Sequence, residues 1–237
     1  VVHLNYEGLW LIALLLRLNP GLKIISHCRT VLPDNLWSRF LVRILEKCVQ
    51  HVFFISPNER DAFLRHSRDL KSHSVLWNIA RPVFPLPIEE RWRSKRIVVL
   101  SNIDPQKGID RCLDLAESLI EAGLSDFRIE IFGMARSASA YVRRLEQDIQ
   151  RRSLGDMVQL MGFTKAPEAE LKSAFCLLRP SLDSDPWGRD VIEAVSAGIP
   201  VLATGAFEGV VVHRRTGFLF EPFDPVSMAA TIQELST

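Results

Sequence analysis

Residues 185–194 have the sequence Asp-Pro-Trp-Gly-Arg-Asp-Val-Ile-Glu-Ala, which predicts a loop that runs into a helix. Pro186 and Gly188 favour a loop or a first helical turn. The apolar residues that follow recur at helical spacing, and Gly198 and Pro200 then end the helix. The next residues are apolar and predict a buried strand. Loop, helix and buried strand in this order are typical of an α/β fold.

The same alternation of strand and helix extends through the chain. In the first part we expect strands over 1–4, 23–26, 51–55 and 74–77, and helices over 7–18, over 34–49 and from Ser56 onward. In the second part we expect strands near 97–101, 128–132, 157–160, 174–178, 200–203 and 218–220, and helices near 108–122, 138–151, 167–173, 188–197 and 225–235. Alternating elements imply parallel sheets, so both parts are predicted to be Rossmann-like. Neither contains G-x-G-x-x-G or a Walker A motif, which argues against a dinucleotide redox enzyme or a P-loop NTPase.

A proline-rich stretch marks the expected boundary between two domains. Three prolines between residues 82 and 87 are followed by a charged run. We therefore predict an N-terminal domain over 1–85, a linker over 86–95 and a C-terminal domain over 96–237. The first strand begins at residue 1 without a lead-in. For this reason we expect the first domain to be incomplete and the chain to be a fragment.

The composition is that of an ordinary globular protein, with 47% hydrophobic and 24% charged residues. The net charge of +1 is unevenly spread. Residues 1–95 hold 14 Lys and Arg against 8 Asp and Glu, or +6, and residues 96–237 hold 15 against 20, or −5. A basic first part suits contact with anionic lipid or an acidic acceptor, although ordinary surface composition explains it as well. No motif favours a nucleic-acid partner.

The cysteines lie at positions 28, 48, 112 and 176, without a Cys-x-x-Cys pair or metal-ligand spacing. They predict reduced thiols in a cytoplasmic protein. The apolar run 9–16 is shorter than the roughly 20 residues that span a bilayer. We expect this run to form a buried helix. The flanking Trp10 and Arg17 leave a helix at the membrane surface as the alternative.

Two carboxylates of the opening stretch are spaced to hold hydroxyl groups on either side of an anion. Asp185 precedes the helix, and Glu193 lies about one and a half turns inside it, at roughly 3.6 residues per turn. Unpaired backbone N–H groups at the helix start suit an anion such as a diphosphate. A nucleotide sugar offers a sugar, a diphosphate and a ribose. The spacing alone equally allows a turn residue at Asp185 and a solvated pair of Arg189 with Glu193.

The stretch resembles the E-x7-E signature of the retaining GT-B glycosyltransferases of the glycosyl transferases group 1 (family 4) type, here as D-x7-E. Four further segments are similar to motifs of this family and follow in the same order: 101–108, 131–133, 158–163 and 216–222. The resemblance is strong over residues 96–235 and looser over 1–85. It implies an α/β GT-B architecture, in which two Rossmann-like parallel-sheet domains face each other across a cleft.

The resemblance also implies the residues of the active site. The catalytic residues would be His27, near the donor sugar, and Asp185, facing it. The donor would be bound by Asn102, Lys107, Gly133, Gly162, Phe163, Trp187, Gly188, Arg189 and Glu193. Simpler explanations exist for some of them. His27 would then be a hydrogen-bonded structural histidine, Lys107 an ordinary surface lysine, and Gly162 with Phe163 a plain strand-end turn.

Two positions depart from the pattern of the family. Ser101 and Asn102 stand where it usually has Gly-Arg, which removes a bidentate phosphate donor. Asp185 stands in place of a longer Glu. Donor affinity and activity are therefore the open points. We expect no metal and no cofactor beyond the donor substrate, because Lys107 and the helix start would meet the charge of the leaving group.

The implied reaction is transfer of a sugar from a nucleotide diphosphate sugar to an acceptor hydroxyl, with retention at the anomeric carbon. The acceptor would be a glycan, a lipid or a small molecule. Two alternatives stay open. One is a non-catalytic module that binds nucleotide sugars, motivated by Asn102 and Asp185, and the other is a GT-B sugar-nucleotide epimerase. We expect a cytoplasmic protein, with peripheral membrane contact through the basic first domain as an option.

Overall fold

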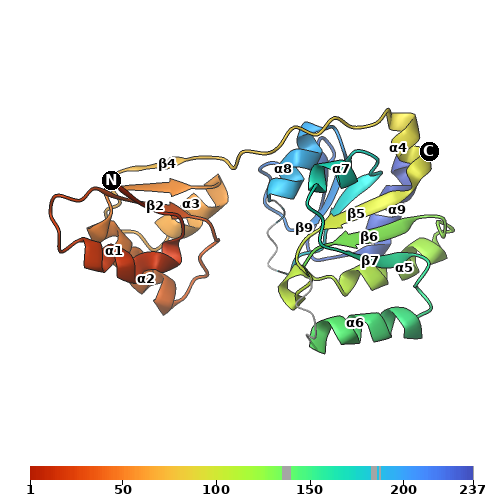
Figure 1. Ribbon diagram of the computed structural model, residues 1–237, viewed down its shortest axis with the longest axis horizontal. Helices are drawn as coiled ribbons and strands as arrows, with labels where there is room; N and C mark the ends of the chain where they lie inside the picture. Colours follow the sequence, from red (N-terminus) through yellow and green to blue (C-terminus); the bar gives the residue numbers. More distant parts are fainter. Residues whose placement is uncertain (135–139, 183–185, 187, 237) are drawn as a thin grey trace. The chain divides into compact units, whose positions relative to one another are not determined.

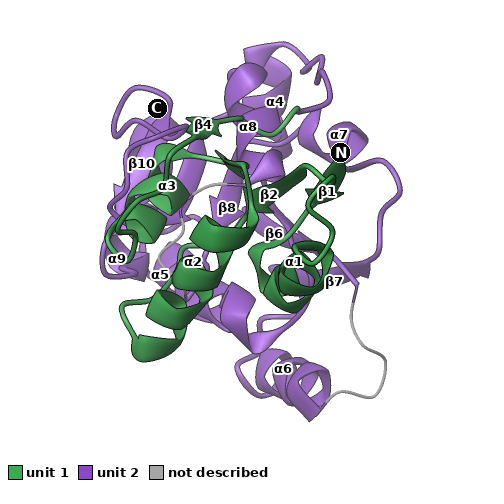
Figure 2. Ribbon diagram, turned by 90° about the vertical axis from the view of Figure 1, so that its left-hand side faces the viewer, with its two compact units in different colours: residues 1–79 green, residues 80–237 purple. Residues whose placement is uncertain are grey.

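The computed structural model describes residues 1–134, 140–182, 186 and 188–236. This part of the chain forms two compact units, Val1–Ile79 and Ala80–Thr237 (Figure 2). Within the described residues, the first unit holds a sheet of four strands and the second a sheet of six. Every strand pairing in both sheets is parallel. The predicted α/β class with two parallel sheets is therefore confirmed.

The first unit orders its strands β1-β2-β3-β4. The strands are β1 (Val2–Leu4), β2 (Ile24–Cys28), β3 (His51–Phe54) and β4 (His73–Val75). The helices are α1 (Trp10–Leu16), which follows a 3-10 turn over Glu7–Leu9, α2 (Leu36–Cys48) and α3 (Pro57–Leu64). Asn35 and Ser56 cap α2 and α3 by accepting backbone N–H groups of the first turn. Ile24 and Phe54, from one face of the sheet, share a core with apolar residues of α2 and α3.

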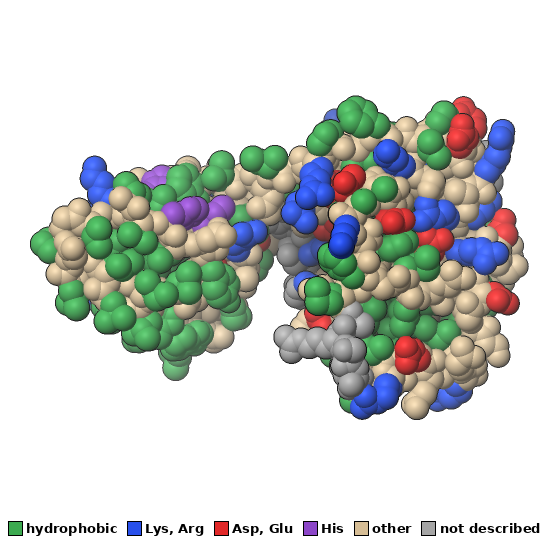
Figure 3. All heavy atoms as spheres, viewed as in Figure 1, with side chains coloured by type: hydrophobic (Ala, Val, Ile, Leu, Met, Phe, Trp, Pro, Cys, Tyr) green, Lys and Arg blue, Asp and Glu red, His purple; other side chains and the backbone are tan. Residues whose placement is uncertain are grey.

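The outward side of α1 and α2 is apolar and exposed. Both helices lie against one face of the first sheet (Figure 1), and Figure 3 shows hydrophobic side chains gathered on their outer side. We call this surface the apolar face; its large exposed side chains are Leu11, Ile12, Leu14, Leu15, Leu18, Leu36, Trp37 and Phe40. Within α1 only Ala13 is buried. The expectation of a buried helix over 9–16 is therefore wrong, because the run is apolar all round and the first unit covers only one side of it.

The second unit orders its strands β10-β9-β8-β5-β6-β7. The strands are β5 (Arg96–Leu100), β6 (Arg128–Phe132), β7 (Val158–Gly162), β8 (Cys176–Arg179), β9 (Val201–Thr204) and β10 (Gly217–Phe220). The helices are α4 (Ile88–Ser94), α5 (Arg111–Glu121), α6 (Ala140–Arg151), α7 (Pro167–Leu171), α8 (Arg189–Ser196) and α9 (Pro225–Leu235), with a 3-10 turn over Pro105–Lys107. The inner strands are almost wholly buried, as expected for a parallel sheet with helices on both faces.

The predicted linker over 86–95 is instead part of the second unit. Most of it forms α4, and the boundary between the units falls between Ile79 and Ala80. Arg91 is only 6% exposed, and its Nε donates to the carbonyl oxygen of Leu86 at 3.2 Å. Ser94 Oγ donates to the carbonyl oxygen of Ser173 at 2.6 Å. Arg91 and Ser94 thus pack through hydrogen bonds to carbonyl groups, a contact that composition does not reveal.

All four cysteines are free and buried. Burial raises the pKa of the Cys112 and Cys176 thiols well above their usual range. Within the described ranges, none of the helices combines the length and the apolar character that crossing a bilayer requires. The same ranges contain no group of three His, Cys, Asp or Glu side chains that could hold a metal ion.

Candidate active site

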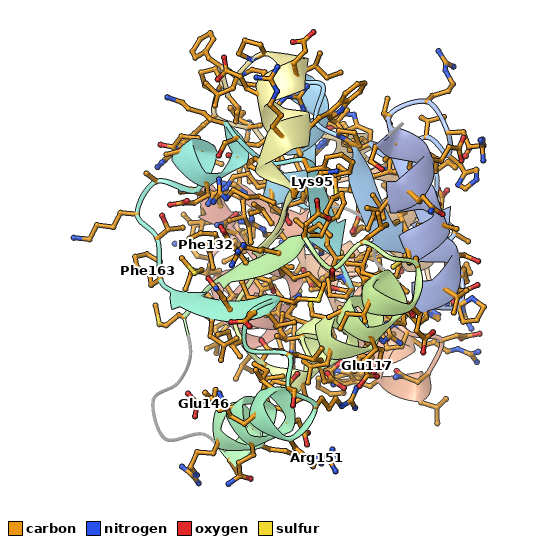
Figure 4. All side chains as sticks on the ribbon, turned by 90° about the vertical axis from the view of Figure 1, so that its right-hand side faces the viewer. Lys95, Glu117, Phe132, Glu146, Arg151 and Phe163 are labelled. Atoms are coloured by element: carbon orange, nitrogen blue, oxygen red, sulfur yellow. The ribbon has the colours of Figure 1, made fainter. Side chains whose placement is uncertain are left out.

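A pocket of about 320 Å³ lies at the carboxyl ends of the strands of the second unit. This is where open parallel sheets bind their ligands. Its lining residues are Leu100, Ser101, Asn102, Lys107, Phe132, Gly133, Met134, Phe163, Thr164, Pro167, Arg179, Arg189, Asp190 and Glu193. Figure 4 shows Phe132 and Phe163 near one another at the ends of β6 and β7, on the side away from Lys95. The pocket thus joins residues from five separate segments of the chain.

Gly133 brings two strand ends into backbone contact at the bottom of this pocket. A Cβ atom at this position would collide with the carbonyl oxygen of Ser101. The N–H of Gly133 donates to the carbonyl oxygen of Gly162 at 2.9 Å, and the N–H of Ser101 donates to that of Phe132 at 3.0 Å. The ends of β5, β6 and β7 are therefore tied together by peptide groups. Gly133 is required by packing, whatever the pocket binds.

Lys107 is held at the pocket by a tight turn. Asp104 accepts the N–H of Gln106 and opens the 3-10 turn that ends at Lys107. Gly108 follows in the left-handed region, with φ of 61°, and a Cβ there would collide with the carbonyl oxygen of Pro180. Only glycine combines this φ with so close an approach to another chain segment. The turn that carries Lys107 is thereby packed against the residue that follows β8.

Glu193 is a buried carboxylate inside α8. It is 1% exposed, and its Oε1 accepts the backbone N–H of Arg81 at 3.2 Å. Nε of Arg189 lies 3.8 Å from the same oxygen, with the Arg189 side chain 61% exposed. The alternative of a solvated surface pair therefore does not hold for Glu193. A carboxylate buried at a pocket wall needs hydrogen-bond donors, and a ligand with hydroxyl groups supplies them.

The start of α8 lies at the same pocket. Its N-cap is Gly188, in extended conformation and without a side-chain cap. Asp185 and Trp187, which were predicted to contact the donor, lie outside the described residues. The first-turn residues Arg189 and Asp190 both line the pocket. The pocket wall thus includes backbone N–H groups at the helix start, for which the described N-cap residue provides no side-chain cap, next to two charged side chains.

Arg179, at the end of β8, was missed by the sequence reasoning. Its side chain is only 12% exposed, and its Nη1 lies 3.5 Å from Oδ1 of Asp190, itself 16% exposed. A Cβ built on Gly188 would come within 3.1 Å of the same Nη1. The guanidinium therefore packs against the backbone at the start of α8. The sequence did contain a signal for this residue, because Arg179 is a charged residue at the carboxyl end of an otherwise apolar strand.

Arg81 was missed as well. Besides the hydrogen bond to Glu193, its Nη1 lies 3.4 Å from Oε2 of Glu168 in α7. This pair joins the first residues of the second unit to two helices at the pocket. No sequence signal identifies it, because Arg81 lies in a proline-rich stretch and its partners follow far along the chain.

His27 lies in the first unit, near the end of β2. It is 8% exposed, its ring stacks on that of His3 with 5.8 Å between centroids, and Phe53 packs edge-on at 6.1 Å. Among the described residues, no hydrogen-bond partner is found for the buried Nε2. Burial lowers the pKa of His27, and the positive charges of Arg29 and His3 lower it further. The alternative of a structural histidine held through Nε2 is therefore not supported.

The structure thus brings together most of the residues that were predicted to bind the donor. Asn102, Lys107, Gly133, Phe163, Arg189 and Glu193 line one pocket. Gly162 and Gly188 adjoin it in sequence, and Gly162 has a φ of 79° at the turn after β7. His27 belongs to the first unit. Among the described residues, the polar groups of the pocket include two carboxylates, an amide, three cations and a helix start without a side-chain cap, an arrangement suited to an anion with hydroxyl groups.

Comparison with known proteins identifies solved structures of similar fold. Anabaena Alr3699/HepE, in complex with UDP and glucose, superimposes with a TM-score of 0.76 at 20% identity, covering 97% of this chain and 67% of that one. TarM superimposes with a TM-score of 0.69 at 18% identity, covering 91% and 44%. Among curated proteins, the exopolysaccharide phosphotransferase SCO2592 of Streptomyces coelicolor is 31% identical over 146 residues, or 60% of this chain. Those residues make up 15% of the relative's length.

The family match is more extensive. Residues 87–237, more than half of the chain, match the model of the family described as Glycosyl transferases group 1. The matched range contains the whole pocket, from Leu100 to Glu193. The order of motifs, the two parallel sheets and this match lead to one conclusion: the chain belongs to the glycosyl transferases group 1 family.

Proposed function

We propose that this protein transfers a sugar from a nucleotide diphosphate sugar to an acceptor hydroxyl, with retention at the anomeric carbon. One observation carries the proposal. The buried carboxylate of Glu193 shares a pocket with Lys107 and the start of α8. A carboxylate suits ribose hydroxyls, whereas a cation and an uncapped helix start suit a diphosphate. Retention rests on the D-x7-E resemblance alone.

The nucleotide is proposed to be a uridine diphosphate. Two similar structures, HepE and TarM, are described in complexes with UDP. The turn at Gly162 and Phe163 would contact the base, and Phe163 is 64% exposed, so a stacked base would cover it. Gly133 would line the phosphate end through its backbone. Lys107 and the N–H groups of α8 would stabilise the leaving diphosphate without a resident metal ion.

Contact with the donor sugar is proposed for Asp185 and, as the family resemblance implies, for His27 of the first unit. His27 offers a buried Nε2 with no partner among the described residues, and its lowered pKa keeps the ring neutral at pH 7. A neutral imidazole nitrogen can accept or donate a hydrogen bond to a sugar hydroxyl. Asp185 keeps its assignment from the sequence. The kinetics of Asp185→Asn, given in the Discussion, test the second assignment.

The decisive experiment is an incubation of the chain with a panel of UDP-sugars and candidate acceptors. Release of UDP together with a new glycoside of the same anomeric configuration, measured by NMR, supports the proposal. Binding of UDP-sugars without turnover would favour the non-catalytic module, motivated by Asn102 and Asp185. Inverted stereochemistry within the sugar ring would favour the epimerase. The Glu193→Gln variant is the control for pocket-dependent turnover, and added EDTA tests the metal-free proposal.

We also propose a cytoplasmic location with peripheral contact to an anionic membrane through the apolar face. Two members of the face, Trp37 and Phe40, form an aromatic cluster with the half-buried Trp10, with ring centroids 5.5–5.7 Å apart. Residues 1–79 carry 10 Lys and Arg against 6 Asp and Glu, or +4. An apolar helix face with aromatic and basic residues is typical of interfacial binding.

Co-sedimentation with vesicles tests the membrane proposal. We expect binding to vesicles that contain phosphatidylglycerol, weaker binding to pure phosphatidylcholine, and loss of binding in a Leu15→Ser/Trp37→Ser variant. Equal recovery of native chain and variant in the supernatant would contradict the proposal. Concentration-dependent dimers that the variant abolishes would instead assign the apolar face to a second copy of the chain.

A further inference from the structure

Arg179 lies where two neighbouring strands and a helix start converge. It is the last residue of β8, which lies between β5 and β9 in the sheet. The three residues before it are fully buried, and Arg179 itself is only partly covered and lines the pocket. Asn102, which follows the adjacent strand β5, lines the same pocket. The side chain of Arg179 is therefore presented from a rigid strand end.

The chain that follows Arg179 is fastened to the turn that carries Lys107. Nη1 of Arg111 donates to the carbonyl oxygens of Pro180 and Ser181, each at 3.0 Å. The N–H of Leu182 donates to the carbonyl oxygen of Gln106 at 3.0 Å. These contacts hold the end of β8 against the turn that carries Lys107. Two cations from separate segments are thus directed to one pocket by a network of backbone contacts.

Asp190 holds the guanidinium of Arg179 in place. The two side chains are 12% and 16% exposed, and their closest atoms, Nη1 and Oδ1, are 3.5 Å apart. A guanidinium carries five N–H donors in a planar fork, so pairing with Asp190 is compatible with binding a phosphate as well. Asp190 also lies in the first turn of α8, where a carboxylate is favoured by the helix dipole. The pair therefore fixes the position of the guanidinium.

Arg179 decides the sign of the charge summed over the described residues that line the pocket. Among the lining residues that the structure describes, Lys107, Arg179 and Arg189 are positive, and Asp190 and Glu193 are negative, which gives a net charge of +1. Without Arg179 the sum would be zero. The remaining arginine, Arg189, has a side chain that is 61% exposed, so water screens it far more than Arg179. A nucleoside diphosphate is an anion, and its binding needs an excess of positive charge in a partly buried site.

We propose that Arg179 binds the diphosphate of the donor together with Lys107, and that Asp190 positions it for this role. Asn102 has no charge, so the guanidinium contact to the phosphate would come from Arg179 in β8 instead of from position 102. The inference deepens the proposed function and rests on it. It assigns a binding role to a strand residue outside the D-x7-E stretch and to its partner in the first turn of α8.

Calorimetric titration with UDP, and NMR titration with uridine, test this assignment. Arg179→Gln should weaken UDP binding by about 10- to 150-fold, the fold-change that corresponds to a charged hydrogen bond of about 1.5–3 kcal/mol. Uridine, which has no phosphate, should bind the native chain and the variant equally. Arg152→Gln is the matched control, because Arg152 pairs with Asp114 and Glu117 away from the pocket.

Two further variants separate binding from folding. Arg179→Gln removes the ion-pair partner of Asp190 and leaves a lone carboxylate in the pocket. We therefore also compare Asp190→Asn with the double variant Arg179→Gln/Asp190→Asn. Neither of these two variants contains the Asp190 carboxylate. The double variant should bind UDP about 10- to 150-fold more weakly than Asp190→Asn. Adding Asn102→Arg to the double variant should restore most of the lost UDP affinity. The new guanidinium would enter the same pocket from the segment that follows β5.

The outcomes distinguish the two proposals. If the native chain binds no UDP, both the proposed function and the role of Arg179 are wrong. The native chain can be compared with Arg179→Gln, and Asp190→Asn with the double variant. If the native chain binds UDP and the UDP affinities are equal within each of these pairs, Arg179 is only a structural partner of Asp190, and the proposed function stands. An equal loss of uridine and UDP binding in the double variant would likewise overturn the assignment, because a phosphate contact cannot act on uridine.

Discussion

The backbone N–H of Arg81 donates a hydrogen bond to Oε1 of Glu193, with 3.2 Å between the two atoms. One residue lies at the start of the second unit and the other inside α8, so a segment far away in sequence holds the buried carboxylate of the pocket. Side chain and main chain of Arg81 have separate roles here. Its guanidinium instead reaches the carboxylate of Glu168.

A pair of substitutions at Arg81 separates these two roles. Arg81→Pro removes the N–H donor, and we expect it to lower the free energy of unfolding by about 1–3 kcal/mol, the cost of a buried polar group without a partner. Arg81→Ala keeps the N–H and loses only an exposed ion pair with Glu168, so it should lower the free energy of unfolding less than Arg81→Pro does. Urea unfolding of both variants checks this. Equal stabilities would show that the N–H contributes nothing.

Glu193→Gln should weaken binding of UDP and of UDP-sugars to the same extent, by about 1.5–3 kcal/mol. The reason is that the ribose is common to both ligands and hardly changes during the reaction. Isothermal titration calorimetry measures both affinities. Glu234→Gln, an exposed position paired with Arg214, is the control. A variant with native affinity for UDP would remove Glu193 from the ribose site.

Lys107→Ala should weaken UDP binding by about 1.5–3 kcal/mol and leave the free energy of unfolding nearly unchanged. The backbone turn that carries Lys107 is held by Asp104, Gly108 and Pro180. Titration and thermal unfolding measure the two quantities. Lys172→Ala, on the exposed surface, is the matched control. Unchanged affinity would return Lys107 to the role of an ordinary surface lysine.

Asp185→Asn should lower kcat more than it lowers the affinity for the donor. Asp185 lies outside the described residues, and the prediction follows from its place in the D-x7-E signature, facing the sugar. Only interactions that strengthen in the transition state raise kcat. Steady-state kinetics and titration with the donor separate the two effects. A variant that weakens UDP binding as much as Glu193→Gln would place the sugar elsewhere.

Stability should fall below pH 6.5 in a way that depends on His27. Burial, with help from Arg29 and His3, lowers the pKa of His27 in the folded chain below the value of 6.5 in the unfolded chain. As the pH falls, His27 therefore takes up a proton in the unfolded chain before it does so in the folded chain. The contribution of His27 to the free energy of unfolding is thus present above pH 6.5 and is lost on acidification. Urea unfolding at pH 7.5 and pH 5.5 should show a smaller difference for His27→Asn than for the native chain. If the free energy of unfolding changes equally between the two pH values in His27→Asn and in the native chain, the pKa of His27 is not lowered.

The sequence pattern predicts the order of the elements and the position of Glu193 in a helix, because periodicity and stop residues are local properties. Contacts between distant segments are not local, and this explains the errors. Arg179 and Arg81 gain their roles from partners that no spacing rule connects to them. The charged run after Pro87 suggested a linker, yet carbonyl groups of the second unit hold it as α4. The apolar run of α1 suggested burial, although Ala13 is the only residue of α1 that is fully buried, and Trp10 and Leu16 are only partly covered.

Backbone contacts at Gly108 and Gly133 divide the pocket into a floor and a rim. The floor is made of peptide groups that pass too close to one another for any side chain. The rim consists of exchangeable side chains such as Asn102, Phe163 and Arg179. A library directed at the rim should therefore yield altered donor preference with the fold intact, whereas substitutions in the floor should be recovered only as unfolded protein. In this family member, donor choice and structural integrity reside in different atoms of the same loops.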